Sequence, residues 1–422
     1  MQETEEPLEL VQRVAALDIG KSMLMACIRV PHEDKPGRRL QEVGEYATTT
    51  RSLLALADRL RCQGVTLVAM EATSDYWKPA FYLLEAEGFE CWLLNAKHVK
   101  NVPGRPKTDK LDAVWLAKVV ERGMCRPSFV PPKPIRQLRD LTRYRRSLVR
   151  ERSSEKQRLE KILEDAQIKL TSVISNLFTV SGRQMLQAMI DGERSPRVLA
   201  EMARGKMRAK LDALQEALTG HFDDHHAFLC TMMLARIDDL TARIGELSEK
   251  VEQVMEPFTT QVDQLIEVTG VGRGSAQEII AEIGVDMTHF PSSDHLVAWA
   301  RYSPQARQSA GKTKSSTTGK GNPWLSGALG EIGIATSRTD TFLGSRYRRI
   351  AKRRGKRRAL VAVGNSVLTI VWHLLSNPDA RFHDLGPGFY ESRINKERQT
   401  RNLMRQLEQL TGRPVVLGET TV

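Results

Sequence analysis

The sequence predicts an α/β domain at the N-terminus, then a long helical connector and an α-helical C-terminal domain. Three observations support this fold class. Short apolar runs alternate with stretches of helical spacing over residues 13–121, which is typical of a partly parallel sheet covered by helices. Helical spacing dominates after that point. A proline-rich segment, residues 126–134, separates the two regions and predicts a domain boundary.

The length and charge of the chain restrict its class. Its 422 residues suffice for two or three domains, and its formal net charge of +12 favours a polyanionic partner, most often nucleic acid. The acidic first residues do not resemble a signal peptide, and we expect no membrane contact because no apolar run approaches the roughly 20 residues that span a bilayer. Five scattered cysteines predict a reducing cytoplasm, with neither zinc nor disulfides.

Strands and helices alternate in the predicted first domain. Strands are expected at 14–19, 23–30, 42–49, 65–70 and 90–95, and helices at 51–62 and 77–88. The first two strands form a hairpin around the turn Gly20-Lys-Ser22. A further helix begins near Asp109 and ends near Gly123, a residue type common at helix C-termini.

Four carboxylates stand at the ends of these elements. Asp18 lies in an otherwise apolar strand, and Glu71 ends another strand. Asp109 and Asp112 are three residues apart, which places both on one face of a helix. Because sites in such sheets gather at the carboxyl ends of strands, we expect the four carboxylates to converge. Oxygen ligands of this kind suit Mg²⁺ or Mn²⁺.

Simpler interpretations of these acids remain open. Asp18 could cap the turn at Gly20, and Asp109 with Asp112 could do no more than stabilise a helix dipole.

A catalytic use of the four acids is the alternative, because two metal ions ~3.5–4 Å apart can clamp the attacking and leaving oxygens of a phosphodiester. The order of a hairpin Asp, a strand-end Glu and a helix with two Asp favours that use, and is the pattern of a ribonuclease-H-like, RuvC-like nuclease domain.

Short stretches of this region resemble the DEDD transposases of the IS-one-ten insertion-sequence family. The resemblance implies that Asp18, Glu71, Asp109 and Asp112 form a metal-binding tetrad, and we add Lys107 of the last stretch as a nucleic-acid contact. Ser74-Asp75 stands where the family usually has Gly after the Thr, which leaves Glu71 in place. The stretches are Leu17-Asp-Ile-Gly-Lys21, Met70-Glu-Ala-Thr73 with Tyr76, Asn95-Ala-Lys97 and Lys107-Thr-Asp-Lys-Leu-Asp-Ala113.

Beyond the proline-rich segment the sequence predicts a long basic helix. Residues 133–158 carry ten basic side chains against three acidic ones. A charge run is usually a solvated face, but this imbalance favours a phosphate-contacting helix in which Arg139, Arg143 and Arg146 are the contacts.

A heptad seam follows at residues 237–254, where apolar side chains step by three and four. Three interpretations stay open: an antiparallel coiled coil with 138–165, a coiled coil with another copy of the chain, or an amphipathic helix on a globular core. Residues 171–235 are less regular, and we interpret their histidines at 221, 225 and 226 as a surface loop or a helix start.

Three further segments favour contact with nucleic acid. Residues 265–284 resemble a helix-hairpin-helix whose tight turn contains Gly270 and Gly272, and the backbone N–H groups there can hold a phosphate. Residues 301–322 predict a loop over a phosphate-binding surface, with Lys312 and Lys320 as contacts. Residues 346–358 hold nine basic side chains and no acid, which favours a backbone-binding helix or arm. Its expected contacts are Arg349, Arg353 and Arg357.

The segment 301–322 also resembles the same transposase family. In that family a Gln-Ser-Gly-Gly-like stretch precedes a turn of a basic residue, Gly and Asn. In this chain Gln308-Ser-Ala310 matches the stretch and Lys320-Gly-Asn322 matches the turn. The resemblance implies that Ser309 is the nucleophile on the DNA backbone. The residues alone leave Ser303, Ser315 and Ser316 as rivals. No histidine lies in this segment, so activation would fall to Lys312, Lys314 or the metal.

We therefore expect four segments. They are a RuvC-like DEDD domain at 1–126, a linker and coiled-coil region with an insert at 127–264, a C-terminal transposase domain at 265–383, and a polar tail at 384–422. A buried helix at 359–375 closes the third segment, and the tail has helical character at 397–410.

The resemblance implies a function in transposition of an insertion element, by DNA strand exchange through a covalent serine–DNA intermediate. It further implies a bridge RNA that pairs with donor and target DNA, a homo-oligomer (dimer or tetramer) whose chains share active sites, and a prokaryotic, nucleoid-associated protein. Two other functions stay open. A metal-dependent nuclease such as a junction resolvase would cleave without a protein–DNA adduct, and a binding protein with an inactive tetrad would not cleave.

Overall fold

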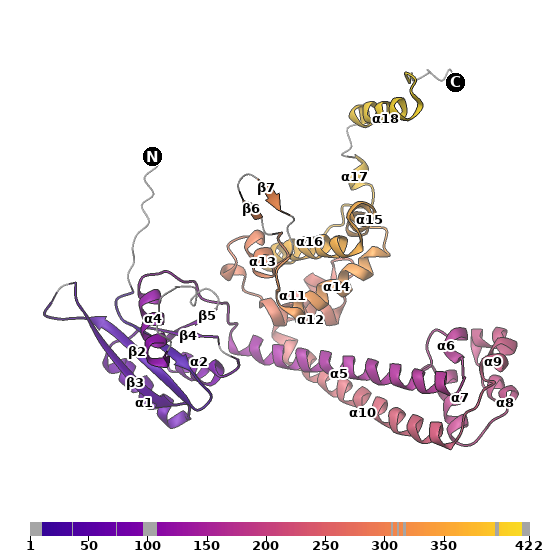
Figure 1. The fold of residues 1–422 in the computed structure, drawn as a ribbon, viewed down its shortest axis with the longest axis horizontal. Coiled ribbons are helices and arrows are strands. Elements are labelled where there is room, and N and C mark those ends of the chain that lie inside the picture. The colour runs from indigo at the N-terminus through magenta and orange to yellow at the C-terminus, as the bar shows by residue number, and fades with distance from the viewer. Residues whose placement is uncertain are drawn as a thin grey trace. The chain divides into compact units, whose positions relative to one another are not determined.

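The computed structural model describes residues 11–35, 37–72, 74–95, 108–304, 307–309, 312–314, 318–392 and 396–415. The chain forms two compact units, Met1–Val130 and Pro131–Val422, and each is described by itself (Figure 1).

The first unit is built on a five-stranded sheet with the order β3-β2-β1-β4-β5 (Figure 1). β1, β2 and β3 pair antiparallel, whereas β4 pairs parallel with both β1 and β5. This confirms the predicted α/β fold, although the third strand starts at Arg39 rather than Glu42. The strands are β1 (Val14–Ile19), β2 (Met23–Pro31), β3 (Arg39–Ala47), β4 (Leu67–Glu71) and β5 (Glu90–Leu94).

Helices cover both faces of the sheet. α1 (Thr50–Cys62) and α2 (Trp77–Ala86) connect β3 to β4 and β4 to β5. Their apolar side chains pack in one core with Leu17 and Met70. α4 (Asp109–Glu121) packs on the opposite face in a second core, which includes the β1 residue Ala16. Alternation of side chains along each strand explains why neighbouring residues enter different cores.

α5 (Lys133–Asp165) and α10 (Asp224–Met255) form an antiparallel pair in the second unit (Figure 1). The Nη1 of Arg152 donates to the Oγ1 of Thr241 at 3.2 Å near the middle of the pair. The heptad seam of α10 therefore packs on the basic helix, and Ile237 and Val251 in it are buried. The two helices of one chain pair antiparallel, as the first interpretation of the seam requires, and the coiled coil itself stays a prediction.

The region that was least regular in sequence forms a compact helical insert at the end of this pair. Its apolar side chains share one core with the ends of α5 and α10. Asp223 caps α10 by accepting from the backbone N–H of His226 at 3.1 Å, so the histidine cluster is a helix start, as interpreted. The helices of the insert are α6 (Leu170–Val173), α7 (Val180–Ile190), α8 (Pro196–Glu201) and α9 (Leu211–Ala217).

Helices also build the C-terminal part of the second unit. α16 packs against α11, α13, α14 and α15. The helices are α11 (Thr259–Ile266), α12 (Arg273–Ile283), α13 (Ser293–Trp299), α14 (Pro323–Ser337), α15 (Phe342–Arg354) and α16 (Lys356–Ser376), followed by α17 (Phe389–Ser392) and α18 (Lys396–Thr411).

Among the described residues, α16 is the one helix that is long and apolar enough, by length and composition, to cross a membrane. Its mean hydropathy is 1.7 over an 18-residue window, so it is longer and more apolar than we expected from the sequence. In this fold one face of the helix, which includes Val363, Val367 and Val371, is buried against the neighbouring helices. The long apolar run is thus explained by its place at the centre of a helical domain.

Gly270, between α11 and α12, provides a test of this packing. Its φ is +89°, and a Cβ added there would lie 2.5 Å from the Cγ2 of Thr336 in α14. We expect Gly270→Ala to lower the free energy of unfolding by about 2 kcal/mol or more, because backbone strain and overpacking add. Gly245→Ala is the control: it lies within α10 with no atom within 4 Å of the added Cβ, and should stabilise by about 0.5–1 kcal/mol. Denaturant unfolding measures both, and equal effects would contradict the packing.

Two buried thiols have strongly perturbed acidity. Cys27 in β2 and Cys230 in α10 are free cysteines, and burial raises the pKa of each to about 11. Because the thiolate is the reactive form, these two side chains behave as small apolar core residues at neutral pH.

Candidate functional site

Asp18 and Glu71 lie side by side at one end of the sheet. Each comes one residue after the last pair formed between the parallel strands β1 and β4. Because side chains alternate along a strand, both share the face of Ala16 and Ala69, which α4 covers. Asp18 is half-buried, and thus more accessible than its position in an apolar strand predicts. Glu71 is buried, with 8% of its surface exposed.

α4 brings the other two acids to the same end. At its C-terminus, the Glu121 carbonyl accepts from the backbone N–H of Val11 at 3.1 Å, and the Glu121 carboxylate pairs with Arg29 at 2.6 Å. Arg29 lies opposite the first residue of β1, so α4 runs antiparallel to that strand. The N-terminal turn of α4, with Asp109 and Asp112, therefore lies at the end of β1 that carries Asp18.

Asp18 and Asp109 line one pocket of about 440 Å³. The turn 20–22 and Glu45 of β3 complete its wall. Asp18 and Glu45 both pair with Met25, so the three form a row across β1, β2 and β3. Glu45 was not predicted from the sequence, because only the strand register shows that it faces the same pocket as Asp18.

The donor set fits a divalent cation in kind. All four predicted ligands are carboxylates at one end of one sheet face, and oxygen ligands suit Mg²⁺ or Mn²⁺. Among the described residues, no three Asp, Glu, His or Cys side chains stand close enough to enclose an ion in this conformation. Lys107, predicted beside this site, lies outside the described residues.

The arginines predicted as phosphate contacts on α5 make intramolecular ion pairs. Arg143 donates two hydrogen bonds to the carboxylate of Glu282, both at 2.8 Å. Arg139 donates to the Glu282 carbonyl at 2.8 Å, and Arg146 pairs with Glu278 and Glu331. These arginines hold α5 against α12 and α14. Their contacts with acids therefore do not support the prediction that they bind phosphate.

The turn before α12 keeps the geometry expected of a helix-hairpin-helix. Gly270 adopts the positive φ of a tight turn, and Gly272 caps α12 with extended backbone. Residues 272–274 are exposed, which leaves the first turn of this helix accessible from outside the chain. Arg273 within it pairs with Glu252 of α10 at 2.6 Å.

The serine segment is a two-stranded ribbon rather than the predicted loop. β6 (Arg307–Ser309) pairs antiparallel with β7 (Lys312–Lys314), and Ser309 stands opposite Lys312. Short-range backbone pairing forms this ribbon, and its Gly and Ser content concealed it in the sequence. Ser303 lies outside the ribbon, whereas the other rivals, Ser315 and Ser316, fall outside the described residues. Lys320, closer to α14, is exposed.

The most basic segment of the chain forms two helices instead of one helix or arm. Gly355, with a φ of +84°, ends α15 and starts α16. Arg349 stacks on the ring of Tyr390 at 4.0 Å. The residues 352–358 around Gly355 are all exposed, and they include the predicted contacts Arg353 and Arg357. We call these seven residues the basic turn.

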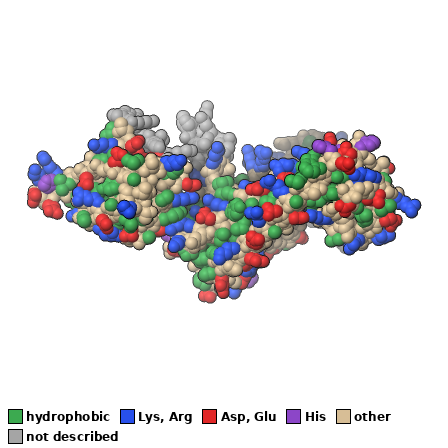
Figure 2. Space-filling view, turned by 90° about the horizontal axis from the view of Figure 1, so that it is seen from below, with side chains coloured by type: hydrophobic (Ala, Val, Ile, Leu, Met, Phe, Trp, Pro, Cys, Tyr) green, Lys and Arg blue, Asp and Glu red, His purple; other side chains and the backbone are tan. Residues whose placement is uncertain are grey.

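Figure 2 shows Lys and Arg side chains interspersed with Asp and Glu over the visible face. This mixture makes the basic turn unusual, because six of its seven residues are Lys or Arg and none is acidic.

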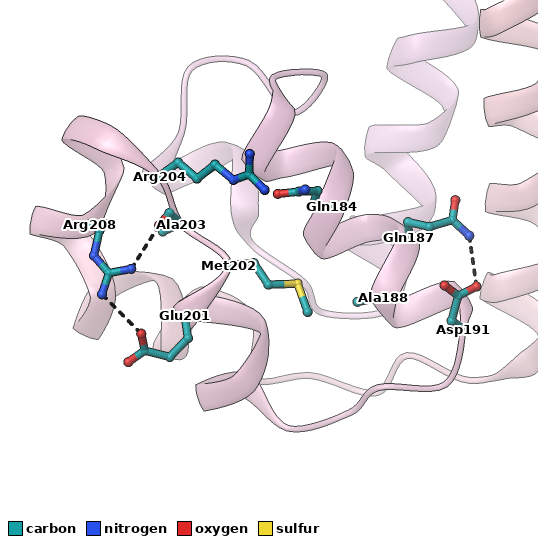
Figure 3. A pocket seen from close by; sticks show the side chains of 9 residues that line it. All are labelled: Gln184, Gln187, Ala188, Asp191, Glu201, Met202, Ala203, Arg204 and Arg208. Atoms are coloured by element: carbon teal, nitrogen blue, oxygen red, sulfur yellow. Dashed lines mark hydrogen bonds and ion pairs between the residues drawn. The ribbon is translucent and has the colours of Figure 1, made fainter.

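A larger pocket, of about 570 Å³, lies in the helical insert (Figure 3). Its wall contains Arg204 and Arg208 but also Asp191 and Glu201, and Arg208 is paired with Glu201 at 3.4 Å (Figure 3). None of the predicted site residues lines it. The equal numbers of basic and acidic side chains in its wall do not favour binding of phosphate. The smaller pocket, which contains the predicted ligands Asp18 and Asp109, is therefore the better candidate for the active site.

Two family models match parts of this chain. A model of DEDD transposases of IS110, described as "Transposase", matches residues 15–168, and a model described as "Transposase IS116/IS110/IS902 family" matches residues 262–369. The insert lies between the two matches. Among solved structures, the chain is similar to "Thermus thermophilus RuvC structure", with 12% identity, a TM-score of 0.22, and coverage of 28% of this chain and 100% of that chain. No curated protein matches the chain.

Proposed function

Because the chain belongs to the IS110 family of DEDD transposases, we propose that it exchanges DNA strands through a covalent serine–DNA intermediate. The N-terminal unit has a RuvC-like fold and the second unit is helical. The observation that carries the proposal is the meeting of the acid-bearing ends of β1, β4 and α4 at one corner of the sheet.

The tetrad of the proposal is Asp18, Glu71, Asp109 and Asp112, which would hold Mg²⁺ or Mn²⁺. A divalent cation bound there would stabilise the negative charge that develops on a phosphodiester during strand cleavage. The protein contributes the placement of the ligands: the sheet fixes two carboxylates, and the N-terminal turn of α4 supplies the other two.

Ser309 is the proposed nucleophile. Its Oγ would attack the phosphorus of the scissile phosphodiester, the Oγ–P bond would form, and the bond from phosphorus to the leaving deoxyribose oxygen would break. The serine proton must leave, because a neutral hydroxyl is a weak nucleophile. Lys312 stands opposite Ser309 in the register of the ribbon, and in its neutral amine form it would receive this proton and pass it to the leaving deoxyribose oxygen. Attack by the freed deoxyribose hydroxyl of another strand would reverse the step and join new ends.

The partners of the proposal are donor and target DNA, a bridge RNA that pairs with both, and further copies of this chain in the prokaryotic cytoplasm. Family membership supports the DNA partner. The basic turn supports a polyanion in general, and the exposed start of α12 offers backbone N–H groups to a phosphate.

The basic turn makes the salt dependence of DNA binding testable. We expect replacement of Arg353, Arg354, Arg357 and Arg358 by Gln to flatten the slope of log K against log salt by up to about 0.9 for each phosphate that these arginines neutralise. Fluorescence anisotropy with duplex DNA measures the slope. The control variant replaces four arginines that already pair with acids, and it should change the slope little. These arginines are Arg183, Arg208, Arg236 and Arg243. Equal slopes in the wild type and the basic-turn variant would exclude the turn from binding.

One experiment tests the proposed function. The protein is incubated with Mg²⁺, labelled DNA from the ends of its element, and RNA transcribed from the DNA that flanks its gene. Denaturing electrophoresis then separates a protein–DNA adduct from cleaved DNA, and sequencing detects joined strands. Adduct and joined strands are expected. Cleavage without an adduct would instead support a metal-dependent nuclease, and binding without cleavage an inactive tetrad.

A further inference from the structure

A buried carboxylate in the second unit connects the long helix α5 to the base of the serine ribbon. Glu282, in the last turn of α12, is 1% exposed. Its carboxylate accepts two hydrogen bonds from Arg143 at 2.8 Å and one from the Nδ2 of Asn322 at 2.5 Å. The Nε of Arg139 lies 3.4 Å away. A carboxylate buried this completely requires such partners.

Asn322 has a second function in the same place. Its Oδ1 accepts from the backbone N–H groups of Trp324 at 3.0 Å and Leu325 at 3.3 Å, which caps α14. One end of the amide is therefore fixed by helix N–H donors and the other by the Glu282 carboxylate. The ring of Trp324 lies beneath the guanidinium groups of Arg143 and Arg150, at 5.6 and 5.2 Å. α5, α12 and α14 thus meet at one polar junction.

This junction adjoins the point where both ends of the serine segment meet. A Cβ on Gly321 would lie 2.5 Å from the carbonyl oxygen of Ala300, so residues 300 and 321 are in close contact. Arg301 adopts a φ of +62°, unusual for a side chain of its size. Tyr302 then packs against Gly364 of α16, where an added Cβ would lie 2.4 Å from its ring. Ser309 therefore belongs to a segment whose two ends are held together at a packed neck.

We infer that Glu282 and Asn322 are positioning residues for Ser309, holding the base of its ribbon at a fixed place on α5, α12 and α14. The inference rests on the proposed function, since it assigns these residues to the serine reaction. Separating the partners of a buried ion pair leaves an uncompensated charge, so the arrangement in which Glu282 meets all of its partners is strongly favoured. Glu282 and Asn322 are neither the nucleophile nor predicted metal ligands, and they act only by holding the ribbon in place. Their replacement should therefore lower the rate of adduct formation and leave DNA affinity unchanged.

The test uses the full-length protein and a charge exchange. Asn322→Asp keeps a good helix cap but places a second carboxylate beside Glu282. We expect the single-turnover rate of adduct formation to fall roughly 100-fold, the effect of small misplacement of a reacting group, at unchanged DNA affinity. Adding Glu282→Gln restores the contact with residue 322, because the amide introduced at 282 can donate to the carboxylate introduced at 322. The amide oxygen can still accept from the Nε of Arg143, whereas the second bond from Arg143 is lost. The double variant should therefore recover a measurable part of the lost rate.

Two controls separate positioning from loss of stability. Asn322→Ser retains a cap without the reach to Glu282, and should also slow the adduct. Thr341→Ala removes the cap of α15 in the same unit, where the Thr341 Oγ1 accepts from the N–H of Gly344 at 3.3 Å. It should lower the melting temperature and leave the adduct rate unchanged. A wild-type rate in Asn322→Asp, or no recovery in a folded double variant, would overturn the inference.

A readout independent of the chemistry distinguishes this inference from the proposed function. Trypsin can cleave after the basic residues of 301–320, and mass spectrometry measures the rate at each one. Asn322→Asp should raise these rates, and the double variant should lower them again. If the wild type forms no adduct, the proposed function fails, while the cleavage rates still show whether the junction holds the segment. Equal cleavage in all variants would mean that it does not.

Discussion

Replacement of Ser309 by alanine is expected to abolish the protein–DNA adduct while leaving DNA binding intact. The change removes one oxygen, the only atom of this side chain able to form a bond to phosphorus. Loss of the nucleophile from other enzymes lowers kcat by up to the order of 10⁶-fold, so the adduct should fall below detection. Affinity should be unaffected because binding depends mainly on cationic side chains, which the variant keeps.

Ser303→Ala is the matched control for this variant. Ser303 lies in the same segment but outside the ribbon, and it is half-buried near the neck. It should form the adduct at the wild-type rate. The measurement is denaturing electrophoresis of labelled DNA, with anisotropy for affinity. An adduct at normal level in Ser309→Ala would exclude this serine and transfer the assignment to Ser303, Ser315 or Ser316.

Replacement of Asp18 by asparagine is expected to remove both activity and the response of the protein to Mg²⁺. Asn has the shape of Asp without its charge, so the effect reports on electrostatics rather than packing. A ligand at 100 times its Kd stabilises a protein by about 2.7 kcal/mol, and the wild type should show a rise in melting temperature of this origin. Asp18→Asn and Asp109→Asn should show little rise.

The same variants should not be less stable without metal. Carboxylates held together repel, and removal of one charge relieves that repulsion. Glu45→Gln is the control, because Glu45 lines the same pocket but is outside the tetrad. It should keep the Mg²⁺ response and activity. Identical Mg²⁺ responses in the wild type and Asp18→Asn would contradict the metal centre, and loss of the response in Glu45→Gln would make that residue a ligand.

Much of the N-terminal unit could be predicted because its signals are local. Apolar runs of strand length predicted β1, β2, β4 and β5, and the turn at 20–22 predicted the hairpin of β1 and β2. β3 is more polar, and its start was predicted three residues late. α4 begins after Thr108, whose Oγ1 accepts from the N–H of Leu111 at 3.3 Å, and Gly123 follows its end with a φ of +64°. The family motifs then selected four acids, and strand order with helix direction brings their elements together.

The second unit shows what local signals omit. The basic residues of α5 and those around Gly355 looked alike in sequence, yet their surroundings differ. Arg143 and Arg146 meet acids 132 to 185 positions away, whereas Arg353 and Arg357 face solvent. The end of α15 at Gly355 did have a signal in the sequence, which the prediction of a single helix or arm overlooked. Gly is the usual residue where a helix ends with positive φ.

The sequence by itself therefore determined the α/β and helical architecture and the transposase resemblance, and that resemblance singled out the four acids and the serine as candidates. These follow from periodicity, caps and short motifs, which depend on neighbours within a few positions. Only the tertiary structure decided that Glu45 shares the pocket of Asp18, that the α5 arginines bind Glu278, Glu282 and Glu331, and that Glu282 reaches Asn322. The partner of a charge is set by packing between distant segments, and a pattern of nearby residues carries no information about it.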